Sequence, residues 1–465
     1  MGKLVKNFNL LPLFLFAVAG SASAVSGDDG YADRFVEVSE TEVVLTDTVA
    51  LPSVLTFGDC LERALAHSTD MREALLSMLQ ADEEIGSARD AWLPEVGFST
   101  SHSFSNYPSP AEGVKGNVYN SSYGIDASWT VWEGNVRKYR LESARISRNI
   151  RTLAGESVVK DLTLAVLQAY LNIMYAREAV DIARLTLEVS TQQTDRCRRL
   201  MEAGRISKVE YAQIESQNAQ DRYAVVQAES NLSSALLEMK KLLNLGIGYT
   251  LEIAPLEFAD SDIDVALPAS GAVYEYAASW LPEIQSNELT RDVYANDIKI
   301  AKAGRMPKIA LQGGVGTGYT SGGPGWGSQM GHGFNEKVGV SLSVPIYDAN
   351  STNRAVAKAR LASLEYDIER DRLLSSLSQT LESLYIDAQT SRGKYHAGTS
   401  RLESANVTAQ LVDRQFELGL VNPLELLTAH NDLLTARLEQ LQNKFMAILA
   451  NKTIEFYATR SVVLP

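Results

Sequence analysis

Two glutamates that could act on ions through their charge occupy matching positions in two copies of one segment. Glu210 lies in EAGRISKVEYAQIESQNAQDR, residues 202–222, and Glu425 lies in ELGLVNPLELLTAHNDLLTAR, residues 417–437. A carboxylate attracts cations and repels anions. An acid early in a helix also favours the helix dipole, whatever else it does. The residues alone leave both interpretations open.

No enzymatic chemistry is visible in the sequence. The histidines lack metal-ligand spacing, and no HExxH, Walker A or nucleophile-elbow pattern occurs. The glycine run GGVGTGYTSGG leads into a loop and a strand rather than a helix, which argues against a phosphate site. We therefore expect no enzyme activity, no cofactor and no metal site. The histidines are His67, His102, His332, His396 and His430.

The repeated segment is part of a longer duplication. TVWEGN at residues 130–135 corresponds to PIYDAN at residues 345–350, with the same offset that separates the two glutamates. Upstream, ARDAWLP ends at Pro94 and its copy AKAGRMP ends at Pro307. Self-similarity in a fixed order indicates a tandem repeat. We expect a first repeat over residues 54–254, a linker over 255–269 and a second repeat over 270–465.

The first residues indicate export from the cytoplasm. Residues 1–24 carry lysines, then an apolar run, then Ala-Ser-Ala, which is the pattern of a cleaved signal peptide. The apolar run is too short to span a bilayer as a helix. The N-terminal extension at 25–53 precedes the repeat, and we assign it no role. The formal net charge of −14 argues against nucleic acid as a partner.

The two cysteines lie far apart in the sequence. Cys60 and Cys197 fall in different predicted elements. An oxidising compartment would permit a disulfide between them, but two free thiols are the favoured interpretation.

Each repeat is predicted to open with a helix that a proline ends. Apolar residues recur at helical spacing from Leu61 to Leu93, and again from Val273 to Met306. Pro94 and Pro307 follow directly and block continuation of the helix. Both prolines are therefore predicted to be hinges between helix and strand.

Beyond each proline the apolar period changes from that of a helix to that of a strand. Alternation predicts strands at residues 95–105, 123–131, 309–319 and 337–346. A soluble sheet covered by helices would show the same alternation. The strand length and the aromatic residues at the ends nearest the helices favour membrane-spanning strands instead. These aromatic residues are Trp92, Trp129, Trp132 and Tyr347.

The rest of each repeat is predicted to form a pair of long helices. No proline occurs from Asn135 to Arg199, so about sixty-five residues could form one rod of roughly 100 Å. A return helix is expected from Ser207 to Leu245. The second repeat has the corresponding pair at residues 350–416 and 422–458. Gly204 and Gly419 suit the ends of the rods, because a helix C-terminus often needs a left-handed residue. Ser207 and Asn422 can cap the helices that follow.

Four strands cannot close a barrel, because known barrels begin at about eight. An open sheet edge in lipid would leave backbone groups without partners. Several chains must therefore pool their strands, so that two chains would give about eight and three about twelve.

With these features in order, the chain resembles the TolC family of outer-membrane efflux and secretion channels. The resemblance is carried by the Ala-Arg-x-x-x-Leu-Pro element at 88–94, its copy at 301–307, and the two glycine turns with their downstream acids. It implies a mixed α and β membrane protein. In this fold class a homotrimer builds a 12-stranded outer-membrane β-barrel, four strands per chain, continued by a long periplasmic α-helical barrel.

The resemblance also implies a function and partners. Such proteins are the outer-membrane exit ducts of tripartite efflux pumps or type I secretion systems, and pass small toxic molecules or secreted proteins outward. Their partners are a periplasmic adaptor, also called a membrane fusion protein, and an inner-membrane transporter of the RND or ABC class, with outer-membrane lipid around the barrel. The alternative is a periplasmic coiled-coil scaffold without channel activity.

The resemblance assigns the two helical turns to the periplasmic tip. Glu210 and Glu425 match gate or selectivity positions, and three copies of Glu425 would ring one axis. One turn later, where the family often has a second acid, this chain has Thr428. The turns would dock the adaptor. Their residues are Gly204, Arg205, Lys208, Gly419, Leu420, Asn422 and Pro423.

Overall fold

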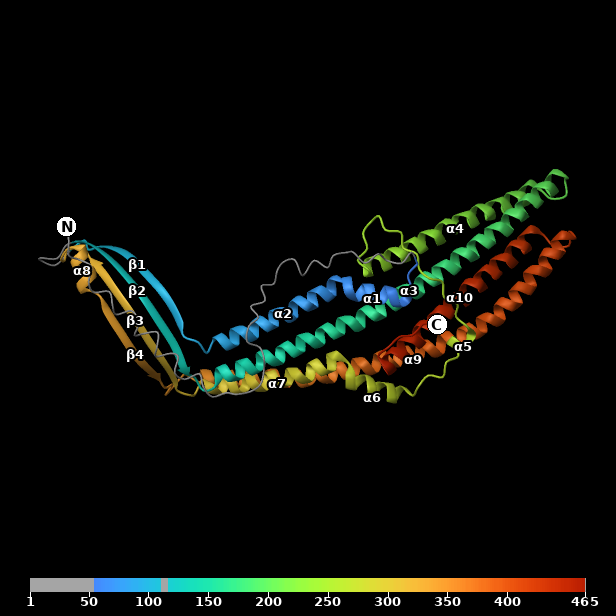
Figure 1. The fold of residues 1–465 in the computed structure, drawn as a ribbon. Helices are drawn as coiled ribbons and strands as arrows, with labels where there is room; N and C mark the ends of the chain where they lie inside the picture. Colours follow the sequence, from blue (N-terminus) through green and yellow to red (C-terminus); the bar gives the residue numbers. More distant parts are fainter. Residues whose placement is uncertain (1–53, 110–115, 465) are drawn as a thin grey trace. The chain divides into compact units, whose positions relative to one another are not determined.

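The computed structural model describes residues 54–109 and 116–464 (Figure 1). The predicted signal peptide and the extension at 25–53 lie outside the described residues. The elements of the first half are α1 (Phe57–His67), α2 (Thr69–Asp90), β1 (Glu95–Asn106), β2 (Asn117–Trp132), α3 (Val136–Glu202) and α4 (Lys208–Leu242). Those of the second half are α5 (Asp260–Ile263), α6 (Ser270–Trp280), α7 (Pro282–Ala303), β3 (Lys308–Thr320), α8 (Trp326–His332), β4 (Asn335–Ser343), α9 (Ser351–Glu417) and α10 (Pro423–Thr459).

Three pairs of corresponding helices in the two halves have equal lengths, and the return helices α4 and α10 have 35 and 37 residues. α1 and α6 have 11 residues each, and α2 and α7 have 22 each. α3 and α9 have 67 each, which confirms the two long rods. Both rods begin after a left-handed asparagine, Asn135 at φ 66° and Asn350 at φ 63°. The boundaries of the two repeats and the linker stay a prediction.

The opening helix of each half is broken in two, where the sequence pattern predicted one continuous helix. In the first half Ser68 leaves the helical conformation, and its hydroxyl accepts a hydrogen bond from the Asp70 amide to begin α2. In the second half Leu281 is extended and Pro282 is the first residue of α7. A proline suits a first helical position but cannot donate a backbone hydrogen bond to the preceding helix.

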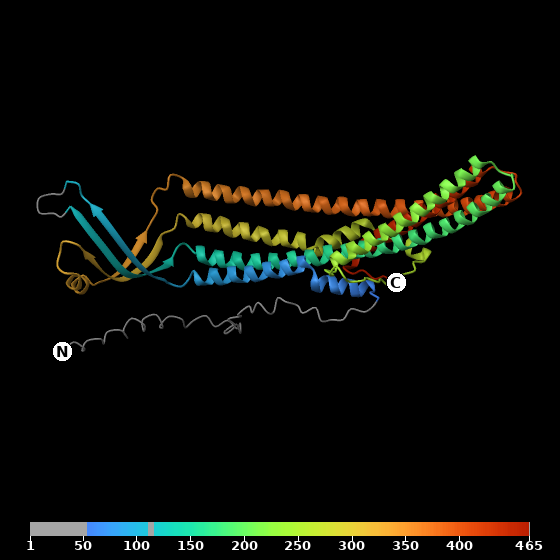
Figure 2. The same ribbon diagram turned by 90° about the horizontal axis from the view of Figure 1, so that it is seen from above.

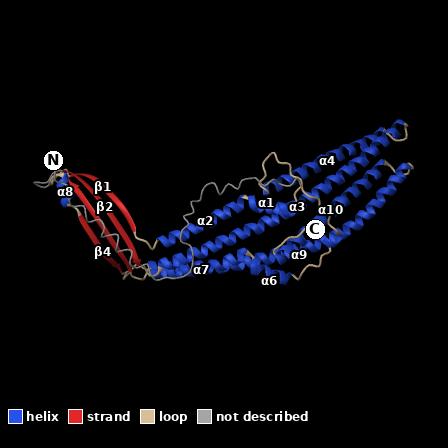
Figure 3. Ribbon diagram, in the orientation of Figure 1, coloured by secondary structure: helices blue, strands red, loops and turns tan. Residues whose placement is uncertain are grey.

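The strands form one antiparallel sheet in the order β1-β2-β3-β4. Figure 3 shows them in red, apart from the helices. β1 and β4 are the edges, and each has one neighbour within the described chain. The loop between β3 and β4 contains α8, which the sequence pattern did not predict. Gln329 holds this loop, because its side chain bonds both the amide and the carbonyl of Thr320.

The two faces of the sheet differ in chemistry. The paired residues Phe98, Ile125 and Val315 share the apolar face. The neighbouring row, which includes Ser99 and Gly124, belongs to a face of small and polar residues. Phe98 is 69% exposed, so no helix among the described residues covers the apolar face there. An apolar face without a cover is typical of strands that contact lipid.

Two strand boundaries differ from those predicted by three residues or more, and the others differ by no more than two. β2 begins at Asn117 rather than at Tyr123, because Asn117 pairs with Asn106 at the far end of β1. Its alternation is masked in the sequence by serines at this end. β4 ends at Ser343 rather than at Ile346, because Ser343 pairs with the first residue of β3 and no partner follows.

The helices continue the strand order as a layer. α2 packs on α3, α3 on α7, and α7 on α9, while α4 returns along α3 and α10 along α9 (Figure 2). Among residues 54–109 and 116–464, no helix has the length and apolar character needed to cross a membrane.

The main apolar core lies where α1, α3, α4 and α10 meet. Tyr170 and Leu167 of α3 are fully buried there, with Ile448 of α10. Cys60 of α1 belongs to the same core. Burial, and to a smaller extent the charge of Asp59, raises the pKa of its thiol to about 12. Cys60 and Cys197 are both free, which confirms the favoured interpretation.

One ion pair ties α3 to α7 beside the core. The Lys160 ammonium donates to Glu283, which also accepts a hydrogen bond from the Ser157 hydroxyl at 2.7 Å. Burial opposes both charges, but the hydrogen bonds and attraction within the pair outweigh it. The pKa of Lys160 is therefore raised and the pKa of Glu283 is lowered. The pair fixes the spacing of two neighbouring helices in the layer.

Candidate functional site at the helical turns

The first turn ends α3 and starts α4 within a few residues. Gly204 is left-handed at φ 69°, and the Arg205 amide donates to the Leu200 carbonyl at 2.8 Å, which closes the helix end. Ser207 then caps α4. Its hydroxyl accepts from the Glu210 amide at 3.1 Å, and the Glu210 carboxylate accepts from the Ser207 amide at 2.7 Å. This is a complete capping box.

The second turn repeats the arrangement with different residues. Gly419 is left-handed at φ 73°, and the Leu420 amide donates to the Gln415 carbonyl at 2.9 Å. The Asn422 side chain accepts from the Glu425 amide at 2.9 Å and donates to the Glu425 carboxylate at 2.9 Å. The predicted left-handed glycines and the predicted caps are confirmed in both turns.

The two glutamates are thus engaged in helix capping. The hydrogen bond from the Ser207 amide lowers the pKa of Glu210, so this carboxyl stays ionised over a wide range of pH. Glu425 is exposed at the matching position. Thr428 is also exposed, and its hydroxyl donates to the Leu424 carbonyl of its own helix at 2.9 Å. Capping explains both acids locally.

The residues predicted to dock an adaptor divide into surface and buried groups. Arg205 and Lys208 are exposed on the first turn. Leu420 is 71% exposed on the second turn, and Asn422 is also exposed. Pro423 is buried, so its role in this chain is to shape the first turn of α10. One turn therefore presents two cations and the other presents an apolar side chain.

A small apolar cluster joins the two hairpins just behind the turns. Cys197 and Ile214 come from the first hairpin, and Phe416 and Leu426 from the second. All four side chains are buried. Burial raises the pKa of the Cys197 thiol, which keeps the thiol protonated. The cluster holds the two turns at fixed spacing.

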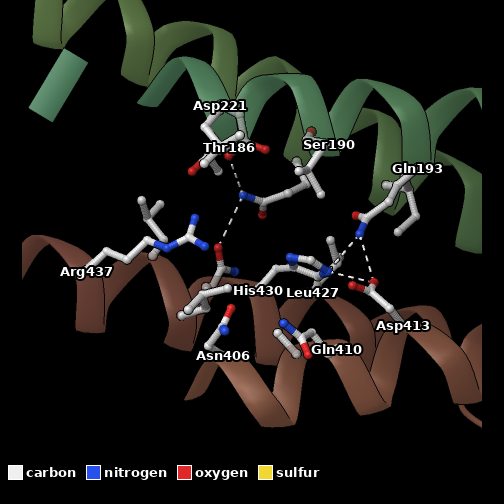
Figure 4. Close-up of a pocket in the computed structure, with 18 residues that line it drawn as sticks. Thr186, Ser190, Gln193, Asp221, Asn406, Gln410, Asp413, Leu427, His430 and Arg437 are labelled. Atoms are coloured by element: carbon white, nitrogen blue, oxygen red, sulfur yellow. Dashed lines mark hydrogen bonds and ion pairs between the residues drawn. The ribbon is translucent and has the colours of Figure 1, made fainter. Parts of the chain in front are cut away.

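Further from the turns than this cluster, the contact between the hairpins becomes polar (Figure 4). The Asp413 carboxylate of α9 lies 2.8 Å from His430 Nε2 of α10, and the Gln193 amide of α3 contacts both side chains. These groups border a cavity of about 220 Å³ between the hairpins. The sequence has no local pattern for this network, because residues more than two hundred positions apart meet there. In the part of the chain that the structure describes, no group of three or more His, Cys, Asp or Glu is placed to hold a metal ion.

The two prolines predicted as hinges lie between helix and strand, and their role as hinges stays a prediction. Pro94 immediately precedes β1, and Pro307 immediately precedes β3. Beside the first hinge, the Trp129 indole donates to the Trp92 carbonyl at 2.8 Å. The Arg137 guanidinium lies 5.0 Å from the centre of the Trp92 ring. The aromatic residues therefore fix the junction between α2, β2 and α3.

This combination of an uncovered sheet and long helical hairpins is the fold of an outer-membrane channel protein. A crystal structure of CusC, a protein that forms a transmembrane channel, superposes with a TM-score of 0.71 at 20% identity. The match covers 86% of this chain and 91% of CusC.

The chain belongs to the outer membrane efflux protein family. The family model matches residues 60–245 and 273–455, so it matches once in each half. The chain is therefore an outer-membrane protein that reaches into the periplasm.

Two relatives are similar to this chain over most of their own length. Outer membrane protein TolC of Escherichia coli is 22% identical over 404 residues, which cover 84% of this chain and 79% of TolC. Alkaline protease secretion protein AprF of Pseudomonas aeruginosa is 25% identical over 305 residues, which cover 64% of this chain and 61% of AprF.

Proposed function

We propose that three copies of this chain form one outer-membrane exit duct, through which a tripartite efflux pump or a type I secretion system passes its cargo. The strands would form a 12-stranded barrel in the membrane, and the helices would continue it as a tunnel. A periplasmic adaptor and an inner-membrane transporter of the RND or ABC class would complete the system. The observation that carries the proposal is the open four-stranded sheet with its uncovered apolar face.

The sheet supports the trimer through its two free edges. β1 and β4 each lack a second neighbour in the described chain. Backbone groups at an edge cannot remain unpaired in lipid, so the edges must meet those of other copies. Eight strands leave an interior filled by side chains, whereas about twelve leave a passage. The small residues on the inner face favour the passage.

The helical layer supports the same closure. α2 and α9 are the outer members of the layer, as β1 and β4 are of the sheet. Each carries exposed apolar residues at helical spacing, which is typical of a face that packs on another helix. On α2 they are Leu75, Leu76 and Leu79, and on α9 they are Leu361, Leu364 and Ile368.

The turns would form the gate and the docking surface of the duct. Glu210 and Glu425 would place rings of carboxylates around the periplasmic opening, with Thr428 one turn further along α10. Arg205 and Lys208 would present a basic surface to the adaptor, and Leu420 an apolar one. Six turns around one opening would then alternate between two kinds of docking surface.

The cargo is proposed only by class. The family description refers to efflux, which supports small toxic molecules. The name of AprF refers to secretion of a protease, which supports secreted proteins.

Reconstitution tests the proposal directly. Purified protein should have the mass of a trimer in detergent and should conduct ions in a planar bilayer. A monomer that never conducts would instead favour the alternative, a periplasmic coiled-coil scaffold without channel activity. Fractionation separates the two further, because a scaffold would be released with the soluble periplasm.

Glu425→Gln tests the gate. Glutamine can still serve as a helix-capping partner, so the variant removes the charge and retains the cap. We expect weaker cation preference and weaker block by divalent cations. Glu403→Gln, on an exposed position of α9 away from the turn, is the matched control. An unchanged ion preference in Glu425→Gln would assign this glutamate to capping alone.

A further inference from the structure

One row of residues crosses the polar face of the sheet through all four strands. Gly97 of β1 pairs with Asp126 of β2, Asp126 with Gly314 of β3, and Gly314 with Lys337 of β4. The Lys337 ammonium lies 2.9 Å from Asp126 Oδ1. Asp126 of β2 and Lys337 of β4 therefore form an ion pair across the face of β3, the strand between them.

The glycine at the centre of this row makes the pair possible. A Cβ atom at position 314 would lie 2.7 Å from Asp126 Oδ1 and 2.8 Å from Lys337 Cε. Both distances are below normal contact, so any other side chain would displace the pair. The Ser99 hydroxyl donates to the other Asp126 oxygen at 3.4 Å.

The pair contributes little to holding the sheet together. The side chains of Lys337 and Asp126 are 69% and 51% exposed. Exposed ion pairs add little to stability, because water already solvates both charges. The backbone ladder of β2, β3 and β4 is continuous on both sides of the row. The pair therefore acts mainly through the charges that it places on the polar face.

The charges on the polar face are balanced. On the described strands this face carries two acids, Glu95 and Asp126, and two bases, Lys308 and Lys337. Glu336 lies on the opposite, apolar face, because it pairs with Val315. Loss of either member of the Asp126–Lys337 pair would leave a net charge on the polar face of each chain.

We propose that Asp126 and Lys337 set the ion preference of the barrel. This inference rests on the proposed channel, in which the polar face lines the passage. Paired, the two charges cancel, and the barrel admits ions of both signs. Without Lys337, the carboxylates of several copies would attract cations and repel anions, and without Asp126 the ammonium groups would do the reverse. In the wild type, where the paired charges cancel, charge selection would occur at the turns rather than in the membrane.

Reversal potentials of the full-length protein in planar bilayers test this inference. A KCl gradient at low ionic strength is suitable, because screening extends over about 30 Å at 0.01 M but only about 10 Å at 0.1 M. Lys337→Met should raise the ratio of cation to anion permeability about twofold or more, and Asp126→Asn should lower it by a similar factor. The double variant should return to the wild-type ratio.

Glu336→Gln is the matched control, since it removes a charge next to Lys337 in sequence but on the other face. Its ratio should equal that of the wild type. Conducting single variants whose ratios equal the wild-type ratio would overturn the role of the pair and leave the channel intact. A wild-type protein that never conducts would overturn the proposed function, and this inference with it.

Discussion

Arg196 of α3 donates a hydrogen bond to Glu417 of α9 at 3.0 Å, and so joins the two hairpins directly behind their turns. Glu417 also accepts from Arg414, one turn earlier on its own helix, at 3.2 Å. Only the first of these contacts connects the two hairpins. Arg196 therefore offers a way to loosen the tip without changing either turn.

We expect Arg196→Ala to loosen the spacing of the two turns of one chain, while the apolar cluster behind them still joins the hairpins. The measurement is the distance between spin labels on the exposed faces of α3 and α9, which should become longer and more widely distributed. In a conducting protein the same variant should lengthen the open periods. Arg414→Ala removes a cation of the same kind but keeps the contact between the hairpins, so it should behave like the wild type. Equal behaviour of the two variants would contradict the prediction.

The same contact should depend on pH in a defined direction. The hydrogen bonds from Arg196 and then Arg414 lower the pKa of Glu417. A lowered carboxyl pKa means that the contact is complete above the ordinary pKa, about 4.3, and is lost as the pH falls through the lowered value. The spin-label distance should stay constant from neutral pH to about pH 4.3 and increase only in stronger acid. An increase between pH 7 and pH 5 would show that other groups control the spacing.

The left-handed glycines should resist substitution for a backbone reason alone. Nothing lies within 4 Å of a Cβ atom placed on Gly204 or Gly419. Alanine at either position should therefore cost about 1–2 kcal/mol, the strain of the left-handed conformation. Gly393 also has open space around its Cβ position but lies inside α9. Gly393→Ala should stabilise the helix by about 0.5–1 kcal/mol. Thermal unfolding midpoints should shift in opposite directions, and a common direction would refute the argument.

Lys160→Met should weaken the contact between α3 and α7. Loss of a hydrogen bond to a charged partner costs about 1.5–3 kcal/mol, because Glu283 would remain half-buried with its charge. The pair's stability is present above the ordinary pKa of Glu283 and below that of Lys160, roughly pH 4.3 to 10.4. It is lost as the pH falls through the lowered Glu283 value or rises through the raised Lys160 value.

Asp161→Asn is the control for this position. Asp161 contacts the same ammonium at 3.2 Å, but its side chain is 69% exposed. Thermal melts across the pH range should show a loss for Lys160→Met that is largest near neutral pH, and little change for Asp161→Asn. A loss of equal size in both variants would show that the effect does not depend on the pair of Lys160 and Glu283.

Local signals carried most of what could be predicted. The rods, the glycine turns and the caps each depend on a few neighbouring residues, such as Ser207 with Glu210, and the structure confirms them. The break at Pro282 also had a local signal, because proline favours the first position of a helix. That signal was outweighed by the apolar spacing, which runs on through the break.

The remaining features depend on residues that are distant in the sequence. Lys160 meets Glu283, and Gln193 meets His430, only after the two halves have packed together. The end of β4 is likewise set by the start of β3 and not by its own alternation, which continues past Ser343. A single sequence has no pattern that registers such partners. The acids at the turns remain explained both as caps and as candidate gate charges.

The free edges of β1 and β4 have a consequence for how the protein is made. In the proposed assembly a newly exported chain carries two rows of unpaired backbone groups until its neighbours arrive. Such edges readily pair with the wrong chain, so the single subunit is the stage most exposed to aggregation. Its maturation then depends on encounters between chains, whose rate rises with subunit concentration. When a cell makes less of this chain, the rate at which finished ducts form would fall by a larger factor than the rate of synthesis.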